Sequence, residues 1–293
     1  DRRGRAGVSR DTDSWHRAAL AVRLLLLDGA ALGGATVRMR ASAARDTLLT
    51  ALAPLPTRRI HPTIGDEQLF GGLDLTETLR SSQVTVNKGL FFTGDPLLLA
   101  MAERCDGTLA AKLAAHLDQN NDHLLIALDE GADESETIPP ALDDRLAFHI
   151  DPQGRMPAGW TPVPAGTVPL NPCLVEAAPD TLETLTMIAA RFGIDSLRAP
   201  TLALRTARAL AALEGRECVS DDDIRQAAEL VYPHRATLVP AEEETQDDTP
   251  PPEESQESSA DEGRDQQALP DGDLLIEAVR ALLPQGLLDG LVP

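Results

Sequence analysis

The stretch "VRMRASAARDTLLTAL", residues 37–52, decides the fold because it passes from a strand through a short loop into a helix. The apolar run "ATVRM" predicts a buried strand, and "ARDTLLTALAPL" predicts a helix that ends at Pro54 and Pro56. Ligands of open α/β sheets bind beyond the carboxyl ends of the strands. The loop between this strand and this helix is therefore a candidate binding site.

Strand and helix patterns alternate along the first half of the chain. Further buried strands are predicted in "PLLLAMA" and "HLLIAL" and at the end of "PPALDDRLAFHI", with a helix over "GTLAAKLAAHLDQN". This alternation predicts an α/β domain over residues 14–155, built on a mostly parallel sheet that helices cover. Residues 1–13 are expected to be disordered, and Asp13 and Ser14 are the expected caps of the first helix.

The second half of the chain has helical patterns that follow a proline-rich connector over residues 156–172. Three segments, "APDTLETLTMIAARFG", "APTLALRTARALAALEG" and "SDDDIRQAAELVYPHR", predict a small all-helical domain over residues 173–239. The second helix is expected to begin at Thr201 and to end at Gly215. In the third, Ser220 and the Asp three positions later resemble a capping box.

An acidic segment follows, and residues 240–270 are too charged and too poor in apolar side chains to bury a core. Residues 241–265 contain 11 Asp or Glu against one Arg, a net of −10 within a formal charge of −21 for the chain. This composition predicts a disordered acidic linker. Residues 271–293 are expected to begin a further segment.

The bulk composition excludes several classes of protein. Excess carboxylate argues against nucleic-acid binding, and the three widely spaced cysteines favour no disulfide framework. No apolar run reaches the ~18 residues of a membrane span, so we expect a soluble, cytoplasmic protein; an address before Asp1 stays open because the sequence does not begin with Met. The histidines do not have the spacing of metal ligands. The "DESET" loop resembles the Asp-x-Ser-x-Ser pattern of a magnesium site but lacks the separate Thr and Asp that complete such a site, so no metal site is expected.

Five segments carry a family resemblance. In chain order they are "GGLDLTETL", "NKGLF", "LLLAMAERCDGTLAAKLAAHLD", "PPALDDRLAFHID" and "LRAPTLALRTARALAALEGR". They resemble the ATPase subunits of magnesium chelatase over roughly residues 14–234, and the altered motifs and acidic linker resemble the D subunits of that family. The resemblance implies an AAA+ module with a β-hairpin insertion, for which "RSSQVTVNKGLFF" is the candidate, a helical lid, and an integrin-I domain beyond residue 293.

The first loop has lost the usual phosphate-binding residues of this family. Glycines, a Lys and a Ser or Thr would surround the phosphates, neutralise them and ligate Mg²⁺. Here Met39, Ser42 and Ala44 stand at the glycine positions, Arg45 at the Lys, and Asp46 at the Ser or Thr. Arg45 and Asp46 are the candidate cofactor-binding residues, but an Asp facing a polyphosphate is repulsive. Tight ATP binding is not expected, and the favoured interpretation makes both residues surface charges.

Two further catalytic positions are altered. The resemblance places Met101 and Ala102 where the ATPases have a metal-binding Asp and a water-polarising Glu, and Gly131 where they have a polar sensor of the γ-phosphate. Glu103 follows, but strand alternation predicts that it points away from the face of Ala102. These losses argue against ATP hydrolysis by this chain.

The arginines of the family pattern are retained. Arg145 in "ALDDRL" falls where the family places its arginine finger, which acts in trans on the γ-phosphate of a neighbouring subunit. Arg198 and Arg205 fall in the lid region of the second sensor. The alternatives are a structural ion pair of Arg145 with Asp143 or Asp144, and a solvated helix face for Arg205.

The resemblance implies an ATPase-inactive platform subunit that forms a hexameric ring with the ATP-hydrolysing subunit I and with further copies of itself. Subunit I would bind ATP and Mg²⁺. The complex, an ATP-dependent ligase, would insert Mg²⁺ into protoporphyrin IX on the large porphyrin-binding subunit, in (bacterio)chlorophyll biosynthesis. Two alternatives stay open: a divergent ATPase that uses Arg45 and Glu103, and a chaperone-like metal loader related to cobalt chelatase.

Overall fold

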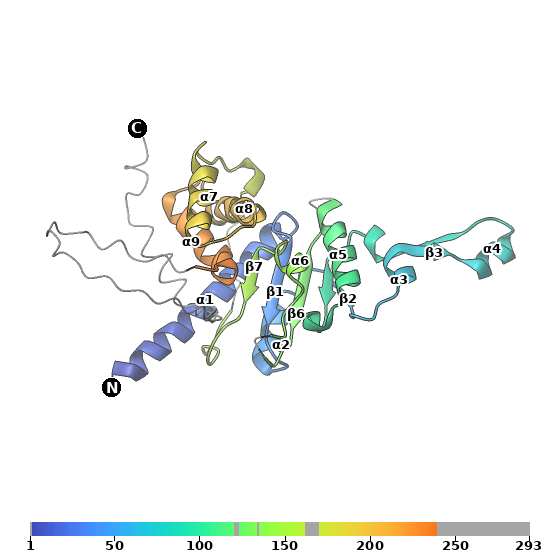
Figure 1. Cartoon of the computed structure of the whole chain (residues 1–293), viewed down its shortest axis with the longest axis horizontal. Helices are drawn as coiled ribbons and strands as arrows, with labels where there is room; N and C mark the ends of the chain where they lie inside the picture. The colour runs from blue at the N-terminus through green and yellow to red at the C-terminus, as the bar shows by residue number, and fades with distance from the viewer. Residues whose placement is uncertain (1, 120–122, 134, 162–169, 239–293) are drawn as a thin grey trace, which may run out of the picture.

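The computed structural model describes residues 2–119, 123–133, 135–161 and 170–238. Figure 1 shows a central sheet between helices, a group of helices at one end and a long arm at the other. The predicted fold class, a parallel α/β sheet with a helical lid, is confirmed. The predicted acidic linker and the segment after it lie outside the described residues.

The described residues form one five-stranded sheet and one two-stranded sheet. The larger sheet has the order β2-β5-β6-β1-β7 and is parallel throughout. Its strands are β1 (Gly34–Arg38), β2 (Arg58–Ile60), β5 (Leu97–Leu99), β6 (Leu125–Asp129) and β7 (Phe148–Ile150). Side chains of β6 alternate between two apolar clusters, with Ile126 in one and Ala127 in the other, so both faces of the sheet are covered.

Two strands differ from the prediction. Strand β2 was missed because Arg58 and Arg59 are exposed and only Ile60 is buried, which leaves no apolar pattern. Strand β5 ends earlier than predicted, at Leu99. Met101 adopts left-handed backbone angles, φ 50° and ψ 52°, and a residue in that conformation does not continue a strand.

The first helix is longer than predicted. Helix α1 spans Arg2–Asp28, so the prediction of a disordered start and of a helix beginning at Ser14 is wrong for residues 2–13. No proline interrupts this stretch. Elongation of a helix costs far less than its nucleation, and the buried residues Trp15 and Leu25 hold the second half of this helix in place by packing.

Three described helices form the lid: α7 (Thr181–Arg191), α8 (Arg198–Leu213) and α9 (Asp221–Val231). The predicted cap at Thr201 is wrong, because α8 begins one turn earlier and the Thr201 hydroxyl donates within the helix to the Leu197 carbonyl. The predicted cap of α9 is confirmed: Ser220 and Asp223 form a reciprocal capping box.

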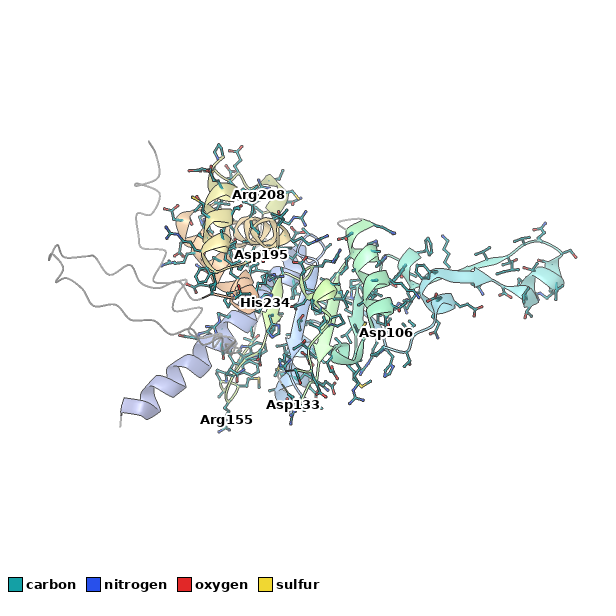
Figure 2. The ribbon with its side chains drawn as sticks, in the orientation of Figure 1. Asp106, Asp133, Arg155, Asp195, Arg208 and His234 are labelled. Atoms are coloured by element: carbon teal, nitrogen blue, oxygen red, sulfur yellow. The ribbon has the colours of Figure 1, made fainter. Side chains whose placement is uncertain are left out.

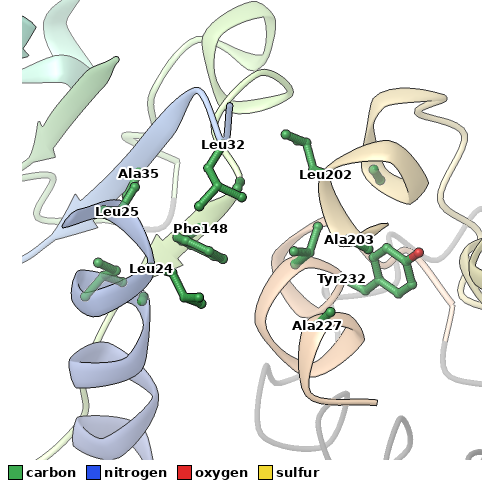
Figure 3. Packing of buried hydrophobic residues seen from close by; sticks show 14 of the residues in the cluster. Leu24, Leu25, Leu32, Ala35, Phe148, Leu202, Ala203, Ala227 and Tyr232 are labelled. Carbon is green, nitrogen blue, oxygen red and sulfur yellow. The ribbon is translucent and has the colours of Figure 1, made fainter. Parts of the chain in front are cut away.

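The lid shares its core with the sheet. Figure 3 shows Leu24 and Phe148 on one side and Leu202 and Tyr232 on the other, all within one buried apolar cluster. Polar contacts reinforce this junction. The buried Arg235 guanidinium donates to the carbonyls of residues 143, 146, 147 and 231, at the ends of α6 (Pro140–Asp143) and α9 and just before β7.

The arm extends away from the sheet (Figure 1). It contains α3 (Asp66–Phe70), β3 (Gly71–Leu73), α4 (Leu75–Ser81), β4 (Val86–Lys88) and the short helix η1 (Leu90–Phe92). The expected β-hairpin within residues 80–92 is only half correct. That segment supplies β4, but the antiparallel partner is β3, and α4 lies between the two strands.

Candidate functional site

Two backbone N–H groups at the ends of the loop between β1 and α2 (Ala43–Ala51) are used within the chain. The Met39 N–H donates to the Asp129 carbonyl at 3.0 Å, which continues the pairing of β1 with β6. At the start of α2 the Ser42 hydroxyl accepts from the Arg45 N–H at 3.2 Å. A phosphate loop would turn such N–H groups towards phosphate oxygens, whereas here these two groups bind within the chain.

Arg45 is an internal ion-pair residue. Its Nη1 lies 2.5 Å from Oε1 of Glu130, the residue after β6, and its side chain is only 13% exposed. The interpretation of Arg45 as a surface charge is therefore wrong, whereas Asp46 is exposed in the first turn of α2. The two candidate cofactor-binding residues thus lie in different surroundings.

A second ion pair joins the ends of the two central strands. Arg38, the last residue of β1, donates to the Asp129 carboxylate at 2.8 Å, and Asp129 is 1% exposed. Arg38 also donates to the carbonyls of Asp133 and Glu136 and so ties the "DESET" loop to the sheet. The other Asp129 oxygen accepts from the Gly131 N–H at 2.8 Å. Sequence reasoning missed this pair, although charged residues at the ends of two buried strands were a usable signal.

Glu103 points towards this network. Strand alternation did not apply to it, because β5 has already ended and Ala102–Arg104 form the short helix η2. The Glu103 side chain is 6% exposed and its Oε2 accepts from the Glu130 N–H at 3.0 Å. Ala102 is buried and offers no polar group. Among the described residues, no group of three or more His, Cys, Asp or Glu is arranged to hold a metal ion.

Arg145 lies in a different cluster and pairs with Asp118, near the end of α5 (Gly107–Gln119). Its Nε and Nη2 donate to the two carboxylate oxygens at 3.0 and 2.5 Å, and its Nη1 donates to the Ala141 carbonyl at 2.6 Å. The alternative prediction, an ion pair of Arg145 with Asp143 or Asp144, is therefore wrong about the partner, which is Asp118. No sequence pattern indicated Asp118, which is 27 residues away.

Arg198 reaches the same carboxylate from the first turn of α8. Its Nη2 lies 3.2 and 3.3 Å from the Asp118 oxygens, and its Nη1 lies 3.3 Å from Asp144. Asp144 also accepts from the Ser196 hydroxyl. The hydrogen bond from Arg145, with the charge of Arg198 beside it, lowers the pKa of the Asp118 carboxyl against the opposing effect of burial. The structure thus brings two of the three predicted arginines together.

The two clusters lie at opposite ends of β1. The first follows the strand's carboxyl end, whereas Gly33, just before the strand, lies against the Arg145 carbonyl. A Cβ on Gly33, which has φ +71°, would approach that oxygen to 2.3 Å, so the contact requires glycine. Figure 2 shows Asp133, next to the first cluster, at one edge of the sheet and Asp195, next to Ser196, towards the other. Arg145 and Arg198 therefore do not face this chain's own loop.

Arg205 belongs to neither cluster. It lies seven residues after Arg198 on α8, a rise of about 10 Å along a helix. Its Nη1 donates to the Ala31 carbonyl at 2.6 Å, in the turn after α1. A fully solvated position for Arg205 is therefore wrong, and its contacts join the lid to α1.

Comparison with known proteins shows which proteins this chain resembles. Residues 182–255 match the model of an AAA lid domain. The magnesium-chelatase 60 kDa subunit of Cereibacter sphaeroides is 46% identical over 290 residues, and that of Rhodobacter capsulatus is 41% identical over 294. The chain is homologous to the magnesium-chelatase 60 kDa subunits. Each alignment covers 94% of this chain and 51% of the relative, so the chain spans about half the length of these subunits. The predicted resemblance to magnesium chelatase subunits is confirmed.

Other similarities are shorter or more distant. A magnesium-chelatase subunit ChlI homolog of Methanocaldococcus jannaschii is 43% identical over 68 residues, 23% of this chain and 19% of that protein. A "putative ATPase" from Cytophaga hutchinsonii has a TM-score of 0.54 over 80% of this chain and 92% of its own. An MCM homolog from Methanopyrus kandleri has a TM-score of 0.51 over 74% and 55%. Both structures are 14% identical and support the AAA+ fold alone. In the described part of the chain, no helix combines the length and apolar character that crossing a membrane requires.

Proposed function

We propose that this chain is a non-hydrolysing AAA+ platform of magnesium chelatase that lends arginines to a neighbouring ATP site. One observation carries the proposal. The chain's own ion pairs close the carboxyl edge of the sheet, where an AAA+ module would hold nucleotide, while Arg145 and Arg198 lie together at the opposite edge.

The residues at the carboxyl edge do not fit ATP with Mg²⁺. Arg45 is paired with Glu130, the Ser42 hydroxyl caps α2, and the carboxylate of Asp46 would repel a triphosphate. Glu103 is the acidic residue that follows the altered positions Met101 and Ala102, and it already accepts a hydrogen bond from the Glu130 N–H. Because a metal-binding Asp is absent from the end of β5, no residue there matches the chemistry that activates water.

The opposite edge offers charge for a reaction in trans. An arginine that reaches a neighbour's γ-phosphate stabilises the transition-state charge and is worth about 10³–10⁵ in rate in well-studied nucleotide hydrolases. Arg145 occupies the position that the family resemblance assigns to this finger, and Arg198, rather than Arg205, lies beside it. We assign Arg198 the role of a second arginine at the same interface.

The family resemblance supports the proposed assembly. The neighbour is the ATP-hydrolysing subunit I, which binds ATP and Mg²⁺, in a ring that also contains further copies of this chain. The complex uses ATP to insert Mg²⁺ into protoporphyrin IX on a large porphyrin-binding subunit, a step of (bacterio)chlorophyll biosynthesis in the cytoplasm. This chain couples the ring to that insertion.

Two measurements test the proposal. The isolated chain should show no Mg²⁺-dependent ATP turnover and no calorimetric heat of ATP binding. In the complex with subunit I, Arg145→Ala should lower ATP turnover at least tenfold without loss of assembly. Arg155→Ala, which removes an exposed arginine from the loop after β7, is the matched control and should leave turnover unchanged.

Three outcomes would overturn the proposal. Turnover by the isolated chain that Arg45→Ala abolishes would establish the divergent ATPase instead. Unchanged turnover of the complex with Arg145→Ala would reduce Arg145 to a structural residue. Stable association with a cobalt chelatase ATPase rather than with subunit I would favour the metal loader.

A further inference from the structure

The Asp118 carboxylate binds the guanidinium groups of both Arg145 and Arg198, whereas an isolated ion pair would hold only one of them. We propose that Asp118 is the positioning residue that holds Arg145 and Arg198 in the orientation in which they meet a neighbouring subunit's nucleotide. The inference rests on the proposed function, because it concerns arginines that act in trans. Asp118 acts through the two guanidinium groups and does not itself contact the phosphate.

Asp118 fixes the plane of the Arg145 guanidinium. Nε and Nη2 of Arg145 both bind the carboxylate, and Nη1 binds the Ala141 carbonyl. A guanidinium has five N–H donors, so these three bonds leave one N–H on each terminal nitrogen. Two such donors match two oxygens of a phosphate. Asp118 therefore orients Arg145 without using every donor that a phosphate needs.

Arg198 depends on the same carboxylate. Its contacts with Asp118, at 3.2 and 3.3 Å, are longer than those of Arg145, and a further contact of 3.3 Å reaches Asp144. Two Asp and two Arg make this cluster formally neutral. Without the Asp118 charge, two guanidinium groups would remain close together beside one carboxylate and would repel each other. Asp118 thus lets α5, α6 and the lid present both arginines at one place.

The experiment uses the complex of the full chain with subunit I. Asp118→Asn keeps the size of the side chain but removes its charge, and it should lower kcat for ATP hydrolysis about tenfold while KM changes less than twofold, since the arginines are misplaced in the transition state. Asp118→Glu, which keeps the carboxylate, should recover part of kcat. The control is Asp66→Asn, which should leave kcat unchanged. It breaks an exposed ion pair between Asp66 on α3 and Lys112, which lies on α5 as Asp118 does.

A triple substitution separates positioning from other roles. If Asp118 acts through the arginines, Asp118→Asn should lower kcat less than twofold further in a chain that already carries Arg145→Ala and Arg198→Ala. An independent, multiplicative loss would overturn the inference, as would loss of assembly in size-exclusion chromatography with Asp118→Asn.

The inference and the proposed function fail differently. An unchanged kcat with Arg145→Ala contradicts the proposed function itself. A lowered kcat with Arg145→Ala, combined with an unchanged or raised kcat with Asp118→Asn, leaves the proposed function standing and overturns the role of Asp118. A raised kcat would mean that Asp118 withholds the arginines from the phosphate instead of orienting them.

Discussion

Arg38 and Asp129 form an ion pair of 2.8 Å across the carboxyl ends of β1 and β6, and the Asp129 carboxylate is almost completely buried. Such a pair compensates a charge that would otherwise be costly to bury. It also joins the two central strands at the edge where AAA+ proteins hold nucleotide. In this chain, protein side chains therefore link the ends of the two central strands directly.

Substitution of Arg38 tests how much this ion pair stabilises the fold. Arg38→Met leaves the buried Asp129 charge uncompensated and should lower the free energy of unfolding by about 3 kcal/mol, the lower end for buried pairs because Arg38 is partly exposed. Asp129→Asn leaves a cation that water can reach and should cost only about 1 kcal/mol. Urea unfolding measures both. A loss with Arg38→Met no larger than that with Asp129→Asn would contradict this account.

The capping box of α9 predicts an acid-dependent stability of the lid. Burial raises the pKa of the Asp223 carboxyl, but hydrogen bonds from Arg216 and Ser220 outweigh burial, so this pKa lies below its usual value. The contribution is therefore fully present above the unfolded pKa of about 3.9 and is lost as the pH falls through the lower folded value. Asp223→Asn should cost about 2 kcal/mol at pH 7. This difference from the wild type should shrink below pH ~4 in thermal unfolding.

His116 also predicts a loss of stability in acid, but the cause is burial of the ring rather than hydrogen bonds to a charged group. Its ring is stacked between Phe91 and His123, and burial, followed by the charge of His123, lowers its pKa to about 4. Between pH ~6.5 and about 4 the unfolded chain binds a proton that the folded chain does not, so stability falls as the pH falls. His116→Phe keeps a stacked ring and should reduce the loss of melting temperature from pH 7 to pH 5. His61→Phe, at an exposed position, should leave that loss unchanged.

The sequence predicts the parts of the fold that short-range patterns encode. "VRMRASAARDTLLTAL" gave the central strand, loop and helix because apolar runs and helical spacing are visible within a few residues. Strand β2 lacked such a pattern, and the direction of Glu103 depended on the left-handed backbone at Met101. A non-glycine residue in that conformation has no dependable sequence signature.

The sequence indicated which arginines are candidates for the site but not which residues they pair with. Arg145 and Arg198 came from the family resemblance, which carries no contact information. Asp118 pairs with them across 27 and 80 residues, and an ion pair between distant elements leaves no periodicity in the sequence. For the same reason Arg45 was taken as exposed, because its partner Glu130 lies 85 residues away.

The arm shows apolar side chains that this chain does not bury. Leu79 and Val84 are 80% and 78% exposed, and Leu73, Val86 and Phe92 are also exposed, whereas Leu69 at the base of the arm is fully buried. Replacing Leu79 and Val84 together by Ser should therefore change the free energy of unfolding by less than about 0.5 kcal/mol per site, as expected for exposed positions. Leu69→Ala, the matched control within the arm, should cost about 2–4 kcal/mol.

Urea unfolding of the three proteins separates two explanations of the arm. A loss above about 1 kcal/mol per site in the double variant would mean that these side chains pack within the folded chain. The expected small change would mean that folding of this chain does not require them, since an exposed leucine gains little from the hydrophobic effect. Exposed apolar side chains gathered in one element can mark an interaction site, so the arm's apolar residues are then to be tested in the assembled complex rather than in the isolated chain.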